Sequence, residues 1–182
     1  MDTVRYFKTS AKAQLKEHGD SGANFGLQQM QHRVATQAGY ISWTALLSAD
    51  EADRQIAVVM DREPQLNRNG FGAGNYAKTP QERREQFAQW RSQLRSSGTR
   101  VAEIGEWLKR NVEPRSSINS RAGSYGLKHL AEKDLGSYVA NGELIAAAII
   151  GNYRYRRNGN TPNAVFSMTT PSIDAVHRRL YR

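Results

Sequence analysis

Along most of this chain, hydrophobic residues recur at intervals of three and four, which is the spacing of an amphipathic helix. Residues that favour helix ends, such as Ser, Thr, Asp, Gly and Pro, separate one apolar pattern from the next. The pattern therefore predicts a series of helices joined by short turns. Their predicted ranges are 9–19, 26–38, 42–49, 50–63, 79–94, 96–113, 127–135, 142–150 and 172–182.

Several of these helices have end signals in the sequence. Thr79 is suited to cap a helix, Pro80 fits its first position, and Glu82 completes a capping box. Asp50 and Asn141 are predicted to cap the helices that follow them. The start at Thr79 is the clearest of these signals, because three residues agree on it.

The segment YRYRRNGNTPNAVFSM, from Tyr153 to Met168, has a different pattern. Aromatic and basic residues alternate over 153–157, turn-forming residues follow over 158–163, and an apolar run returns over 164–168. Strand-like segments on both sides of a turn are typical of a β-hairpin. We therefore predict a mainly α protein with a small β-hairpin, of the α+β class.

A glycine-rich stretch suggests how the chain is divided. Gly70, Gly72 and Gly74 lie in a segment without a clear helical or strand pattern, and the spacing and lysine of a phosphate-binding P-loop are absent. We interpret residues 64–79 as a connector. It would join an N-terminal helical subdomain, residues 1–63, to a helical subdomain with the basic hairpin, residues 80–182.

Two helices around a glycine turn, followed by a basic hairpin, is the order of elements in winged helix-turn-helix proteins. The C-terminal part is therefore predicted to be winged-helix-like. However, the helix that would read DNA, NGELIAAAII, contains no Arg, Lys or Gln to contact base edges. A buried core helix is the alternative for this segment. The helix–glycine–helix outline around Gly39 fits a helix-turn-helix and also a small helical bundle, and bundles are commoner.

Charge adds a functional expectation to this outline. The chain has 182 residues, a formal net charge of +9 and a pI of about 10.0. Residues 115–182 carry ten basic and four acidic side chains, so most of the excess positive charge lies in this last third. A field of this sign attracts phosphate polyanions. It favours nucleic acid as the partner.

The residues expected to contact nucleic acid lie in this last third. In an extended strand Arg154 and Arg156 share one face of the hairpin, where they would reach phosphates or a minor groove. Backbone contacts would dominate, with weak dependence on base sequence. The full predicted set is Arg115, Arg121, Lys128, Tyr153, Arg154, Tyr155, Arg156, Arg157, Arg178 and Arg179.

Other classes of site find little support in the sequence. There is no cysteine, which excludes disulfides, thiolate nucleophiles and cysteine-ligated metals, and the four histidines lack metal-ligand spacing. Common hydrolase and metalloprotease motifs are absent. His129 and Glu132 share a helix face, which we interpret as a surface hydrogen bond and not an acid–base pair. We expect no enzymatic activity, no cofactor and no metal.

The sequence has no long apolar segment and no secretory signal. We therefore expect a cytoplasmic protein without membrane contact.

Two segments carry a resemblance. The stretches AKAQLKEHG and AGYISWTALL, within residues 11–47, resemble a small helical module in uncharacterised proteins of bacterial plasmids, integrative elements and phages. The stretch SYGLKHLAEKDLGSYVANGELIAAAII is similar to segments of hypothetical proteins from the same kind of element. The resemblance implies an accessory protein of a mobile element.

This origin leaves a second function open beside nucleic-acid binding. A basic protein of a phage or plasmid is also suited to dock on an acidic patch of a host protein or ribonucleoprotein complex. It would then act as an inhibitor of host defence, in the manner of an anti-CRISPR protein. The sequence does not identify the protein target, and it does not indicate an oligomeric state.

Overall fold

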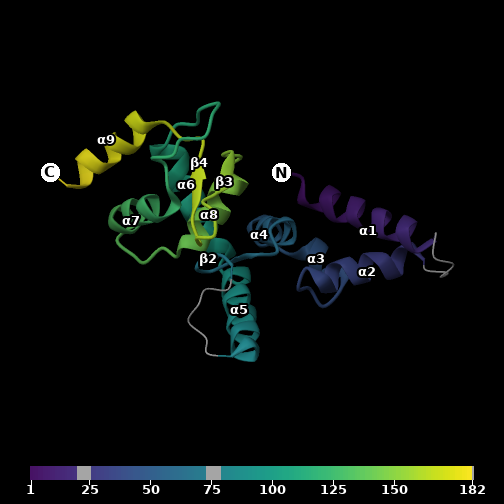
Figure 1. Ribbon diagram of the computed structural model, residues 1–182. Helices are drawn as coiled ribbons and strands as arrows, with labels where there is room; N and C mark the ends of the chain where they lie inside the picture. The colour runs from purple at the N-terminus through teal and green to yellow at the C-terminus, as the bar shows by residue number, and fades with distance from the viewer. Residues whose placement is uncertain (20–25, 73–78, 182) are drawn as a thin grey trace.

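The computed structural model describes residues 1–19, 26–72 and 79–181 (Figure 1). Within these residues the protein is mainly helical with two small antiparallel hairpins, which confirms the predicted α+β class. The first half contains α1 (Thr3–Gly19), α2 (Leu27–Gln37), α3 (Trp43–Ser48), α4 (Glu51–Arg62), β1 (Leu66–Asn67) and β2 (Gly70–Phe71). The second half contains α5 (Pro80–Arg95), α6 (Gly98–Asn111), α7 (Ser124–Leu135), α8 (Asn141–Ile150), β3 (Tyr155–Arg157), β4 (Ala164–Phe166) and α9 (Thr170–Leu180).

The first hydrophobic cluster lies among the N-terminal helices. In Figure 1, α1 and α2 lie alongside each other, with α3 and α4 next to them. Phe7 and Ala11 of α1 are buried here with Met30 and Val34 of α2 and with Leu46 of α3. Burial of these apolar side chains removes them from water and so holds the short helices together. Helix α1 begins six residues earlier than the pattern predicted.

The second cluster surrounds α8. Every residue from Asn141 to Ala148 is buried, and the helix contacts α4, α6 and α7. Its alanines present little bulk, which permits neighbouring helices to approach closely. The chain order of a winged helix-turn-helix is present, but α8 is a core helix and is not exposed to enter a major groove. The burial of α8 confirms the alternative of a core helix for this segment.

Helix α4 belongs to both clusters. Ala57 and Val58 are buried in the first, whereas Ile56, Val59 and Met60 are buried in the second. Five consecutive buried residues make this helix apolar on more than one side, as expected of an element enclosed between two layers.

The segment interpreted as a connector is only partly described. Residues 66–71 form the β1–β2 hairpin, and Leu66 is fully buried in the second cluster. Gly74 and the rest of 73–78 lie outside the described residues. The division into two subdomains at 64–79 stays a prediction.

The β1–β2 hairpin, the start of α8 and the 158–163 loop meet in one polar junction. The Gly142 N–H donates to the carbonyl of Arg68 at 2.8 Å, and the Phe71 N–H donates to that of Pro162 at 2.9 Å. The Asn141 side-chain amide donates to three acceptors here, namely Asn69 O, Pro162 O and Asn163 Oδ1. The segments can come this close because Gly142 and Gly70 have no side chain.

Two of the three predicted caps differ from the sequence-based expectation. The capping box at Thr79 and Glu82 is confirmed, with bonds of 3.0 and 3.1 Å in the two directions. Asn141 was expected to cap α8, but it is the first helical residue, and Glu143 accepts the bond from the Ala140 N–H. The Asp50 side chain makes no capping bond.

Replacing Gly142 tests the junction. A Cβ at this position would overlap the carbonyl oxygen of Asn67, so Gly142→Ala should destabilise the protein by about 3 kcal/mol. Gly105→Ala is the control, since that helical glycine has nothing within 4 Å of its added Cβ. It should gain about 0.5–1 kcal/mol from helix propensity. Urea unfolding measures both, and equal stability of the two variants would contradict the close packing.

Candidate nucleic-acid interface

One face of the β3–β4 hairpin is attached to the body of the protein. Tyr153 is buried, and its hydroxyl donates to the Val112 carbonyl at 2.7 Å. The Tyr155 ring stacks on Phe71 with 6.4 Å between centroids, and its hydroxyl donates to the Glu63 carboxylate. Burial, together with the bond to Glu63, raises the pKa of Tyr155 to about 12. These two tyrosines therefore serve as anchors of the hairpin.

Arg157 belongs to the same inner face. Its guanidinium lies 4.4 Å from the centroid of the Phe71 ring and forms an ion pair with Glu63. A cation above an aromatic face and beside a carboxylate is already compensated. Of the three arginines on β3 and just before it, Arg157 is thus the one that forms an ion pair within the described residues.

The opposite face carries Arg154 and Arg156. Both are exposed, as the alternation of side chains predicted. Arg154 donates to the Ser116 carbonyl at 3.1 Å, which brings the hairpin against the loop that precedes α7. Among the described residues, no partner is found for the Arg156 side chain.

The same loop runs alongside β4, on the side away from β3. The Arg115 N–H donates to the Ser167 carbonyl at 2.8 Å, and the Asn119 N–H donates to that of Phe166 at 2.9 Å. The Arg115 guanidinium donates to Ser117 Oγ at 2.8 Å and remains exposed. The loop and the hairpin are thus fixed to each other by backbone bonds.

Together they form a surface of one charge. We call it the loop–hairpin surface and define it by Arg115, Ser116, Ser117, Arg154 and Arg156. An open hollow of about 630 Å³ borders it, lined in part by Ser116, Ser117 and Arg154. Arginine and serine side chains are frequent partners of phosphate oxygens. The sequence predicted the arginines, and the structure brings three of them to one place.

The other predicted cations divide into two groups. Lys128 is buried, where its Nζ donates to Glu132 at 3.0 Å and to the Val139 carbonyl at 3.2 Å. Arg179 makes two bonds of 2.8 Å to Asp134. Both are held by the fold and are left out of the surface. Arg121 and Arg178 are exposed, but they lie outside the loop–hairpin surface as defined.

Glu63 is the residue that sequence reasoning missed. It is bonded to Tyr155 and Arg157, which follow it by 92 and 94 residues. A solitary glutamate at the end of a predicted helix carries no local signal of so distant a partner.

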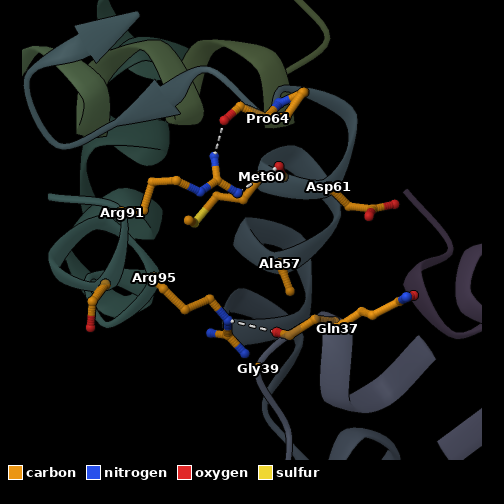
Figure 2. Close-up of a pocket in the computed structure, with 10 residues that line it drawn as sticks. Gln37, Gly39, Ala57, Met60, Asp61, Pro64, Arg91 and Arg95 are labelled. Atoms are coloured by element: carbon orange, nitrogen blue, oxygen red, sulfur yellow. Dashed lines mark hydrogen bonds between the residues drawn. The ribbon is translucent and has the colours of Figure 1, made fainter. Parts of the chain in front are cut away.

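The pocket in Figure 2, of about 290 Å³, is lined by α4, α5 and the end of α2. Arg91 and Arg95 extend into it from α5 (Figure 2). Arg91 donates to the carbonyls of Met60, Glu63, Pro64 and Leu66, and burial lowers its pKa. Arg91 is thereby a cap for the C-terminal end of α4. Its hydrogen-bonding capacity is directed at the protein itself.

Arg95 is equally engaged. It donates to the Ala38 carbonyl at 3.2 Å and forms a two-bond ion pair with Asp53. Asp53 also accepts a bond of 2.6 Å from the Tyr40 hydroxyl. Burial opposes ionisation of Asp53, but the bonds from Arg95 and Tyr40 outweigh it and hold its pKa below the usual range. The two arginines of this pocket thus join helices to one another.

His129 and Glu132 are bonded at 2.7 Å, as the spacing predicted. The same carboxylate accepts from Lys128 and from the Val139 N–H, so its acceptor sites are largely used.

Over residues 1–19, 26–72 and 79–181, no group of three His, Cys, Asp or Glu is placed to hold a metal ion. In that part of the chain, every helix is too short or too polar to span a bilayer.

Comparisons with models of protein families, with curated proteins and with solved structures give no match to this chain. The site is therefore characterised by its own geometry and charge.

Replacing Asp53 tests the ion pair beside the pocket. Asp53→Asn should lower stability at pH 7 by about 1–2 kcal/mol, a value reduced for partial exposure of the pair. Because the folded-state pKa lies below 3.8, this stabilisation is present above that pH and is lost as pH falls through the lower value.

Urea unfolding at several pH values measures the difference between wild type and Asp53→Asn. The difference should be full at neutral pH and should close in acid. Asp50→Asn is the control, since that carboxylate is exposed and makes no capping bond. A difference that persisted in strong acid would show that the charge of Asp53 is not its cause.

Proposed function

We propose that this protein is a non-enzymatic nucleic-acid-binding protein of a phage or plasmid. The observation that carries the proposal is the convergence of Arg115, Arg154 and Arg156 on the loop–hairpin surface. None of the three has an acidic partner within the described residues. Cations that the fold leaves uncompensated are available to replace the counterions of a phosphate backbone.

The contacts are expected to be with the backbone and not with base edges. Helix α8, which occupies the place of a recognition helix in the chain order, is buried. The loop–hairpin surface offers arginines and hydroxyls, which fix the position of a nucleic acid without carrying a base code. Binding should accordingly depend strongly on salt and weakly on sequence.

The internal polar contacts support a binding role over a catalytic one. Arg91 and Arg95, which extend into the pocket of Figure 2, and Glu132, which is bonded to His129, are also bonded to other groups of the protein. A catalytic acid or base must be available to a substrate proton.

The variant Arg115→Gln/Arg154→Gln/Arg156→Gln tests the surface. Removing three phosphate contacts should weaken binding of duplex DNA at low salt. It should also flatten the log–log dependence of affinity on salt by roughly three units. Fluorescence anisotropy across a salt series measures both quantities.

A matched control separates local contact from total charge. Arg83→Gln/Arg84→Gln/Lys109→Gln removes the same charge from exposed positions on α5 and α6. Its salt slope should equal that of the wild type. Binding that is absent, independent of salt, or equally impaired in both variants would contradict the loop–hairpin surface as the contact.

Arg156 and Arg157 provide a comparison between neighbours. Arg156→Gln should reduce the salt slope by about one unit and leave stability within about 0.5 kcal/mol. Arg157→Gln should leave the slope unchanged and lower stability by about 0.5–1 kcal/mol, because it loses the Phe71 and Glu63 contacts. Anisotropy measures the salt slope of the two single variants, and urea unfolding measures their stability. If Arg157→Gln reduced the slope and Arg156→Gln lowered the stability, the roles given to the two faces of the hairpin would be wrong.

A further inference from the structure

Helix α1 carries a stripe of four cations. Arg5, Lys8, Lys12 and Lys16 follow one another at intervals of three, four and four, which places them in one sector of roughly 80° around the helix. All four are exposed. From first to last the stripe extends over roughly 16 Å of the helix axis. We call it the α1 stripe.

The stripe lies away from the core. Phe7 and Ala11 are buried against the neighbouring helices, and Thr3, also buried, bonds to Glu51. These residues lie on the other side of the helical wheel from the cations. The α1 stripe is thus displayed on the solvent side of the first cluster.

Nearby acidic groups do not compensate the stripe. The Asp2 carboxylate accepts from the Arg5 backbone N–H at 2.9 Å, which makes it an N-terminal cap. Glu51 is bonded to Arg54, and Asp61 is bonded to Tyr6. Within the described residues no ion pair forms with any cation of the stripe. Like charges one turn apart repel each other and weaken the helix, so a partner of opposite charge would relieve this cost.

We propose that the α1 stripe binds the phosphate backbone of a nucleic acid, as a contact region separate from the loop–hairpin surface. A straight row of cations, without apolar side chains between them, complements a linear polyanion. Duplex DNA carries about one charge per 1.7 Å of its axis, so several phosphates lie within the length of the stripe. An acidic membrane surface is a poorer match, because a helix lying on a membrane inserts its apolar face. The apolar face of α1 is already buried in the protein.

This inference rests on the proposed function, because it takes nucleic acid as the partner. The α1 stripe is a different surface from the loop–hairpin surface. Figure 1 shows α1 on one side of the molecule, apart from β3, β4 and α9. The spacing of the four cations is visible in the sequence. The small net charge of residues 1–49, with five basic and three acidic side chains, does not reveal it.

The test is the variant Arg5→Gln/Lys8→Gln/Lys12→Gln/Lys16→Gln, with anisotropy on duplex DNA across a salt series. Glutamine has a helix propensity close to that of Lys and Arg, so circular dichroism should show an unchanged helix content. The salt slope should flatten by roughly three to four units. The control Arg83→Gln/Arg84→Gln/Lys109→Gln/Arg110→Gln removes the same charge elsewhere and should retain the wild-type slope.

Comparison with the loop–hairpin variant separates the two proposals. If only the α1 variant changes the slope, the α1 stripe is supported and the loop–hairpin surface is not. If only the loop–hairpin variant does, the α1 stripe is overturned and the proposed function stands. If wild type shows no salt-dependent binding, both fall. A last experiment measures cosedimentation with phosphatidylserine vesicles. If the α1 stripe bound these vesicles and did not bind DNA, the inference would also be overturned.

Discussion

The close approach of backbones around Gly142 is the constraint on which the rest of the structure depends. At this point the start of α8, the β1–β2 hairpin and the 158–163 loop exchange hydrogen bonds directly between main chains. A side chain at Gly142 or Gly70 would separate the segments by its own width. Because the 158–163 loop also joins β3 to β4, the position of the basic hairpin follows from this junction. The exposed arginines are therefore placed in part by backbone contacts that involve no charge.

A second arrangement holds the first half of the chain against this junction. Arg91 donates to four carbonyls at and beyond the end of α4, where the backbone has no helical partners of its own. It thereby ties α5 to the segment that leads into β1. Arg95, one turn further along α5, secures the turn after α2 through Ala38. Two arginines that look like surface charges in the sequence are in this way structural cross-links.

The sequence predicted most helices and the hairpin because these depend on local spacing. The capping box at Thr79 and the alternation along the hairpin are local signals, and both are confirmed. Pairings between distant residues have no such signal. Nothing near Lys128 in sequence shows that its Nζ is buried against Val139, and nothing near Arg157 indicates Glu63. The composition of α8 did indicate burial, since beyond Glu143 in its first turn the helix has only Leu, Ile and Ala side chains, which do not bond to solvent or to bases.

The position of α4 in both clusters has a consequence for how the molecule responds to disturbance. If either cluster unfolded, α4 would lose part of its packing. The other cluster, which also packs on α4, would then be destabilised. The two parts should therefore share one cooperative transition, whatever the separation between their surfaces. A ligand that binds the folded form of one part then lowers the free energy of the whole folded protein relative to the unfolded chain. Binding at one part of the molecule therefore protects the other part from unfolding.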